Sequence, residues 1–105
     1  MSLFLFFRRI VITENIDIND QPNWCTCYFR EFQNWIKNEA PKEMPAGYND
    51  WIMLFSEHCK INFHVLIAMS NDLTSATGFN FMWESEQDQL AFKNKFSAKN
   101  HPHSV

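Results

Sequence analysis

The feature that most restricts the fold is an amphipathic stretch, "NWCTCYFREFQNWIKNEAP", over residues 23–41. Its apolar side chains recur every three to four residues, which is the spacing of one face of an α-helix. The residues on this face are Cys25, Tyr28, Phe29, Phe32, Trp35 and Ile36. Asn23 is a candidate N-cap, and Pro41 disfavours helical backbone at Ala40. We therefore predict a helix over residues 24–39 that buries its aromatic face against a second layer of structure.

Apolar stretches elsewhere in the chain predict the strands of that second layer. "LFLFFRRIVI" (3–12) begins apolar on both faces, as in a strand that is covered on both sides. "KINFHVLIAM" (60–69) and "GFNFMWE" (78–84) place alternate apolar residues on one face. The short run "WIMLF" (51–55) fits either a buried strand or a helix capped by Asp50, and we favour the strand.

The remaining segments are predicted to be loops and one further helix. Residues 13–22 have no sustained period and are expected to form a loop, and residues 70–77 are expected to form a polar turn. Ser85 and Asp88 have the spacing of a capping box, which predicts a helix that ends near Phe96.

The predicted order is therefore β-α-β-β-β-α. We expect an α+β fold with one antiparallel sheet and two helices on one face, related to ferredoxin-like folds. The whole of residues 1–97 is expected to be one domain, followed by a tail at residues 98–105.

Bulk properties restrict the class of protein. The chain has 105 residues, a net charge of −3, 46% hydrophobic residues and 20% charged residues, which are globular values. A protein that binds nucleic acid mainly through phosphates is usually basic, so this charge argues against such a partner. No apolar run approaches the roughly 18 residues of a membrane span, and "MSLFLFF" is too short for a signal peptide. We predict a cytoplasmic protein with three reduced cysteines.

The stretch "TGFNFMWE" (77–84) resembles the third-strand signature of the RNA-recognition domain. The matching positions are Gly78, Phe79, Phe81 and Met82, and the departures are Thr77, Asn80 and Glu84. This resemblance implies a sheet whose aromatic side chains stack on bases, which gives a single-strand nucleic-acid binder as the alternative function. Alternation also fits ordinary core, so we expect Phe79 and Phe81 to be buried and Trp83 to be partly exposed.

The last third of the chain resembles small orphan proteins of tailed phages, which are aromatic-rich and end in a strand, an acidic helix start and "A-F-K-x-K-F". The residues that carry this likeness are Phe79, Phe81, Glu84, Asp88, Ala91, Phe92, Lys93, Lys95 and Phe96. The resemblance implies an origin in a phage and no particular activity.

Thiol and imidazole groups are the candidate metal ligands. They are Cys25, Cys27, His58, Cys59 and His64. A structural zinc site usually takes two cysteines spaced C-x2-C, whereas C-x-C on a helix directs its side chains about 200° apart. We therefore predict no metal and no cofactor, and we keep a zinc-stabilised or thiol-dependent enzyme as a third hypothesis. A helix start near Cys25 and Cys27 would lower the pKa of a thiol there, as such an enzyme requires.

No catalytic constellation appears in the sequence, so we expect a protein that is not an enzyme. Trp24, Tyr48, Trp51 and Trp83 are more large aromatic side chains than a small core easily absorbs, and such residues are typical of interfaces. We predict a protein that acts by protein–protein contact, either on a host factor or by assembling with itself as a homodimer.

Overall fold

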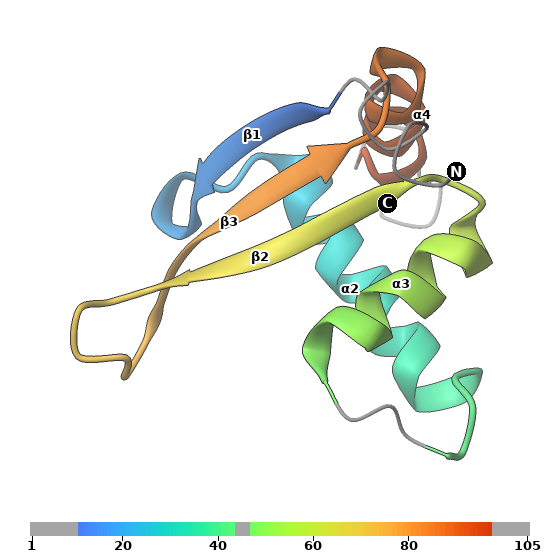
Figure 1. Ribbon diagram of the computed structural model, residues 1–105, viewed down its shortest axis with the longest axis horizontal. Coiled ribbons are helices and arrows are strands. Elements are labelled where there is room, and N and C mark those ends of the chain that lie inside the picture. Colours follow the sequence, from blue (N-terminus) through green and yellow to red (C-terminus); the bar gives the residue numbers. More distant parts are fainter. Residues whose placement is uncertain (1–10, 44–46, 98–105) are drawn as a thin grey trace, which may run out of the picture.

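A computed structural model of the chain describes residues 11–43 and 47–97. Over these ranges the chain forms an α+β fold with one antiparallel sheet of three strands and three α-helices (Figure 1). The elements are β1 (Ile12–Asp17), a 3-10 turn η1 (Ile18–Asp20), α2 (Asn23–Asn38), α3 (Tyr48–Cys59), β2 (Phe63–Met69), β3 (Ala76–Trp83) and α4 (Glu86–Phe96). The sheet order is β1-β3-β2, so β3 is central and the other two strands form the edges.

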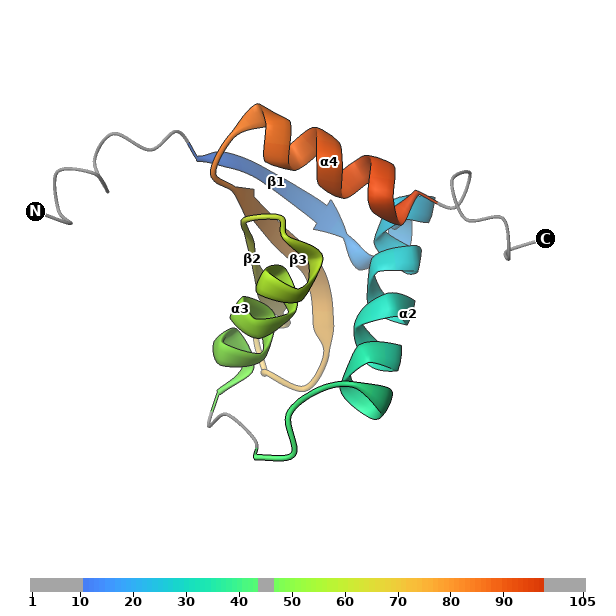
Figure 2. The same ribbon diagram turned by 90° about the vertical axis from the view of Figure 1, so that its right-hand side faces the viewer.

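The helices cover one face of this sheet. Phe63 and Trp83 pair across β2 and β3, as do Val65 and Phe81, and all four side chains are buried. They join the buried side chains of α2, α3 and α4 in a single cluster. Figure 2 shows α3 and α4 in front of the strands, with α2 beside them. The opposite face of the sheet has no helix over it among the described residues.

The predicted helix over residues 24–39 is confirmed by α2, which buries Tyr28, Phe32 and Trp35. Its N-cap is Pro22, not Asn23, and Pro22 makes no side-chain capping bond. Ile36 was expected on the buried face but is 38% exposed, because it lies at the margin of the stripe.

The strand favoured for residues 51–55 is wrong, because these residues lie inside α3. Ile52, Phe55 and Ser56 are the buried residues of this helix, and their three- and four-residue spacing selects one helical face. Asp50 lies in the first turn of α3 and not at its N-cap, which is Gly47.

The loop predicted for residues 13–22 is also wrong, because β1 and η1 occupy most of it. The strand alternates between half-buried residues, which are Ile12, Glu14 and Ile16, and exposed ones. This two-residue period is hard to see in the sequence because the middle half-buried residue, Glu14, is acidic. Glu14 lies on the helix-covered face, where its carboxylate pairs with Lys93 Nζ at 3.0 Å and accepts a hydrogen bond from Gln89 Nε2 at 2.7 Å. The strand predicted for residues 3–12 and the tail at 98–105 fall almost entirely outside the described residues.

The capped helix predicted to follow Ser85 is confirmed by α4. Ser85 is the N-cap of α4, and its hydroxyl accepts a hydrogen bond from the backbone N–H of Asp88 at 3.1 Å. Glu86 and Asp88 place negative charge in the first turn, which is where the helix dipole favours it. The helix buries Phe92 and Phe96 and leaves Leu90 in solvent.

Candidate interaction surface

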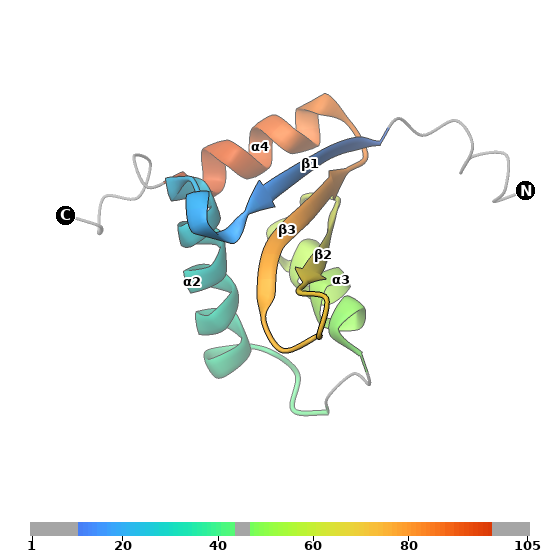
Figure 3. The same ribbon diagram turned by 90° about the vertical axis from the view of Figure 1, so that its left-hand side faces the viewer.

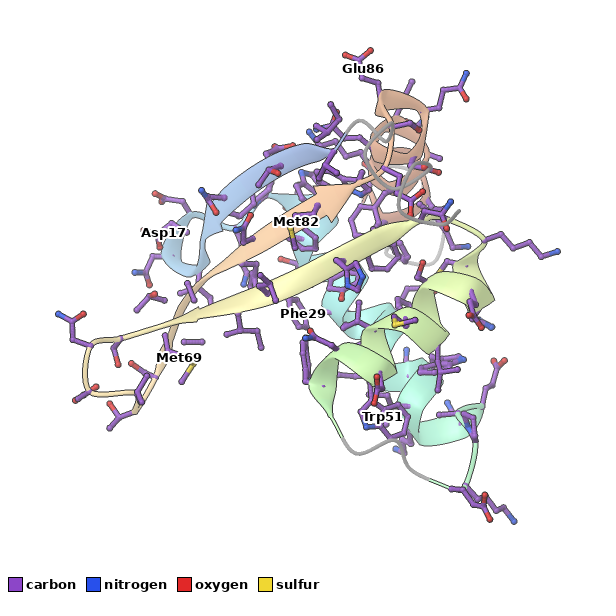
Figure 4. All side chains as sticks on the ribbon, viewed as in Figure 1. Asp17, Phe29, Trp51, Met69, Met82 and Glu86 are labelled. Atoms are coloured by element: carbon purple, nitrogen blue, oxygen red, sulfur yellow. The ribbon has the colours of Figure 1, made fainter. Side chains whose placement is uncertain are left out.

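The hairpin of β2 and β3 carries the largest concentration of exposed apolar side chains along the described chain. Leu66 is 44% exposed, Ile67 37%, Met69 44% and Leu73 73%. We call these four residues the hairpin surface. In Figures 1 and 3 the turn that carries Leu73 projects away from α4, and Figure 4 shows Met69 on the part of β2 that extends past the helices. Leu66 and Ile67 lie on opposite faces of β2, so a partner that contacts the whole hairpin surface reaches both faces of the hairpin. Clusters of exposed apolar groups are typical of contact sites.

The turn at the tip of the hairpin is held by a dense set of hydrogen bonds. The Asp72 carboxylate accepts bonds from the hydroxyls of Ser70 (2.6 Å) and Thr74 (2.7 Å), and from the backbone N–H of Thr74 (3.2 Å). These bonds, with the Ser70 hydroxyl first, lower the pKa of Asp72 to about 2. The backbone N–H of Ser70 donates to the carbonyl of Ser75 at 2.8 Å and closes the turn. The turn is therefore a fixed platform and not a loose loop.

Leu73 has an unusual backbone conformation within this platform. Its φ is 59°, in the left-handed region that a bulky side chain rarely adopts. Its backbone N–H donates to the Ser70 carbonyl at 2.9 Å, which helps to hold it there. A large apolar side chain is thus presented to solvent from a backbone that favours Gly or Asn, at a cost in stability.

The second component of this site is the outer edge of β2, which pairs with no other strand among residues 11–43 and 47–97 and is called the free edge below. β2 is an edge strand, and its sequence FHVLIAM contains no Asp, Glu, Lys or Arg. Exposed edge strands in stable monomers usually carry charged residues, because charge prevents pairing with another chain. The edge of β2 therefore has the composition of a strand that accepts a partner strand.

A groove of about 640 Å³ lies beside the start of β2, between α3 and the uncovered face of the sheet. Val11, Met53 and Met82 contribute apolar surface to it, and His64 contributes an imidazole. Val11 and Met53 are exposed. The groove therefore adds apolar surface at the start of β2, whereas the hairpin surface lies on the outer half of β2 and the turn that follows it.

The four aromatic residues predicted as interface candidates lie in different environments. Trp24 and Trp51 are half-buried, and Tyr48 is 37% exposed at the start of α3. The Trp24 ring packs against Phe81 with centroids 5.1 Å apart. Trp83 has no exposed surface, so it is a core residue and offers nothing to a partner.

The aromatic residues of the RNA-recognition resemblance are core residues. Phe79 is 5% exposed, and Phe81 and Trp83 are 0% exposed. The expected burial of Phe79 and Phe81 is confirmed, and the expected partial exposure of Trp83 is wrong. Trp83 is covered because Phe92 of α4 packs on it, with ring centroids 5.5 Å apart. None of these rings is available to stack on a base.

The candidate metal ligands do not converge. Cys25 and Cys27 are buried in the first turns of α2, whereas His58 and His64 are exposed on α3 and β2. His58 lies against Trp35, with ring centroids 5.8 Å apart. Within residues 11–43 and 47–97, no three Cys, His, Asp or Glu side chains form a group that could hold a metal ion.

Cys25 and Cys59 do not have the low pKa that nucleophilic cysteines need. Burial, reinforced by the negative charge of Glu14, raises the pKa of Cys25 from 9.0 to about 12. Burial likewise raises the pKa of Cys59 to about 12. The lowered pKa expected from the helix start is therefore wrong for Cys25, because loss of solvation outweighs the dipole.

Comparisons with known proteins add no assignment: no protein-family model, no curated protein and no solved structure matches this chain. In the described part of the chain, no helix has the length and apolar character that crossing a membrane requires. The function must therefore be inferred from the surface itself.

Sequence reasoning missed the hairpin surface, although two signals for it are present. One is the absence of Asp, Glu, Lys and Arg along residues 63–69, whose alternation by itself predicts only a strand. The other is Leu73, a single large apolar residue within the polar segment "SNDLTSAT". Both signals depend on knowing that β2 is an edge strand, which the sequence does not specify.

Proposed function

We propose that this chain is a small non-enzymatic, phage-encoded protein of the host cytoplasm that acts through protein–protein contact. Its binding region is the hairpin surface with the free edge of β2. The observation that carries this proposal is the exposure of Leu66, Ile67, Met69 and Leu73 on one projecting hairpin. The phage origin rests on the resemblance of the last third of the chain. The relation to ferredoxin-like folds belongs to the same proposal, and the antiparallel sheet with helices on one face supports it.

The hairpin is suited to recognition for a physical reason. Its turn is fixed by the hydrogen bonds of Asp72, so little conformational entropy is lost when a partner binds Leu73. An edge strand adds backbone hydrogen bonds to an extended partner segment, and its side chains supply specificity. The left-handed backbone at Leu73 is the kind of local strain that persists at functional sites.

The two other hypotheses have less support. A single-strand binder that stacks bases on Phe79, Phe81 and Trp83 would need these rings at the surface, and they are buried. A thiol enzyme would need an accessible cysteine with a low pKa, whereas the pKa values of Cys25 and Cys59 are raised.

The experiment is an affinity capture from host lysate, with bound proteins identified by mass spectrometry. The test variant combines Leu66→Ser with Leu73→Asn. Asn tolerates the left-handed backbone and removes only the apolar side chain. The matched control is Leu90→Ser, which removes an exposed leucine from α4, far from the hairpin (Figure 1).

We expect a protein that is captured by the unmodified chain and by the control, and that is lost with the hairpin variant. Equal capture by all three chains would refute the hairpin as the contact surface. A thermal melt of each variant checks that the fold is retained.

A further inference from the structure

We infer that the free edge of β2 binds a second copy of this chain, in an antiparallel two-fold pairing that joins two three-stranded sheets into one of six. This inference rests on the proposed function and names one partner for the same surface. The contact is isologous, because the same strand is used by both copies. Its core is the outer half of β2, Val65 to Met69, in which Val65 is buried and the residues from Leu66 onward are exposed.

The two edges of the sheet differ in a way that selects β2. β1 carries Glu14 and Asp17, and its sequence ITENID is acidic, so two copies paired along β1 would repel each other. β2 carries no Asp, Glu, Lys or Arg, so pairing it with itself brings no like charges together. For a chain with a net charge of −3, an uncharged strand at an open edge is the place where two copies approach with least repulsion.

In a pairing centred on Ile67, the two-fold symmetry fixes which residues lie opposite one another, and the irregularity of β2 between Ala68 and Met69 lies beyond the central pairs. It places Ile67 opposite Ile67 of the second copy, and Leu66 opposite Ala68, so that a large side chain meets a small one. Ile67 shares the face of Phe79, its partner on β3, whereas Leu66 shares the opposite face with Asn80. Because opposite residues in this register point to the same side, the helix-covered faces of both copies lie on one side of the joined sheet.

The exposure of Ile67 also explains why a second copy would stabilise this strand. Ile67 lies on the face that is buried elsewhere in β2, yet it is 37% exposed. The outer part of β2 extends past the helices in Figure 1. In the pairing, the two Ile67 side chains cover each other. The same register brings the turn with Asp72 toward the end of the second copy where Lys60 lies, and these charges are opposite in sign.

The first test is disulfide cross-linking through Ile67→Cys. Directly opposed residues in antiparallel strands have Cα atoms about 4.5–5.5 Å apart, which is within the range of a disulfide. The control is Asn15→Cys, which puts an exposed cysteine on the opposite edge of the sheet. Cys25 and Cys27 are buried, and the partly buried Cys59 is replaced by serine in both variants so that it does not compete. After mild oxidation, we expect a covalent dimer of Ile67→Cys on a non-reducing gel and mostly monomer for Asn15→Cys. Equal yields from the two variants would overturn the pairing.

The second test measures mass in solution by sedimentation equilibrium. We expect the unmodified chain to form dimers at about 100 µM, and Ile67→Lys to weaken dimerisation about tenfold or more, because it opposes two charges at the two-fold axis. A monomeric unmodified chain, or an undiminished dimer of Ile67→Lys, would overturn the inference. If the chain is monomeric but the hairpin variant still loses a lysate partner, the proposed function stands and only the self-pairing fails.

Discussion

Truncation of Phe81 to alanine tests whether the aromatic strand β3 is core or a binding platform. Phe81 is 0% exposed, and its ring packs on Trp24, Tyr28 and Phe92 with centroids 5.1 to 5.5 Å away. Removing a buried phenylalanine costs about 3–5 kcal/mol, from lost burial and the cavity that remains. The ring is in the centre of the cluster, so neighbouring rings cannot close the cavity and we expect about 4 kcal/mol.

This loss is large relative to the whole domain, whose stability is expected to be about 5–15 kcal/mol. With a urea m value of about 2 kcal/mol per M, the unfolding midpoint should fall by about 2 M. The melting temperature should fall on the order of 15–30 °C. Tryptophan fluorescence is a suitable probe, because Trp24 and Trp83 both pack against Phe81.

The control is Leu90→Ala, which truncates an exposed side chain of α4 and should change stability by less than about 0.5 kcal/mol. Binding to short single-stranded RNA is measured for both variants. The reasoning would be refuted if Phe81→Ala lost less than about 1 kcal/mol of stability. RNA binding that Phe81→Ala abolishes without a change in melting would show that the ring acts as a base platform.

Three further predictions concern polar and ionisable side chains. The Tyr28 hydroxyl is buried and has no hydrogen-bond partner among the described residues. Tyr28→Phe should therefore raise the free energy of unfolding, measured in urea, by about 1 kcal/mol. A decrease of that size would instead show that the hydroxyl has a hydrogen-bond partner. The raised pKa values of Cys25 and Cys59 mean that the folded state holds these protons more tightly, so stability should be constant below about pH 9 and fall toward pH 12. Urea unfolding between about pH 9 and pH 12 measures this fall in the free energy of unfolding. Replacing Cys25 and Cys59 by alanine should make the free energy fall less steeply with pH. An unchanged pH dependence would contradict the assignment of the fall to these two thiols. A double-mutant cycle of Glu14→Ala and Lys93→Ala should give a coupling of about 0.5–1 kcal/mol that salt weakens; zero coupling at low salt would contradict the pairing.

The sequence predicted those elements whose pattern is strong and local. The amphipathic period of α2 and the capping pair Ser85 and Asp88 each specify an element from a few neighbouring residues. It failed at β1, because Glu14 breaks the apolar alternation and its partner Lys93 is distant in sequence. It failed at residues 51–55 because a five-residue apolar run fits a strand and a helix equally well, and the packing of α3 on β2 and α2 decides. The hairpin surface could not be predicted, because exposure of a strand edge depends on the order of strands in the sheet.

The resemblance of residues 77–84 to an RNA-recognition strand has a structural explanation that involves no nucleic acid. Gly78 is required because a Cβ atom there would lie 2.7 Å from the carbonyl oxygen of Ile16 on β1. Phe79 and Phe81 alternate because one face of a central strand is covered by helices. A central strand that packs closely against a neighbouring strand and buries one aromatic face therefore needs the same residue types as the RNA-recognition signature, for reasons of packing. What distinguishes this chain is the adjacent strand, where apolar residues continue past the helices to Met69 and remain exposed. Stable monomers usually carry a charge at such an edge, so the uncharged, apolar edge of β2 is the residue-level argument for a partner.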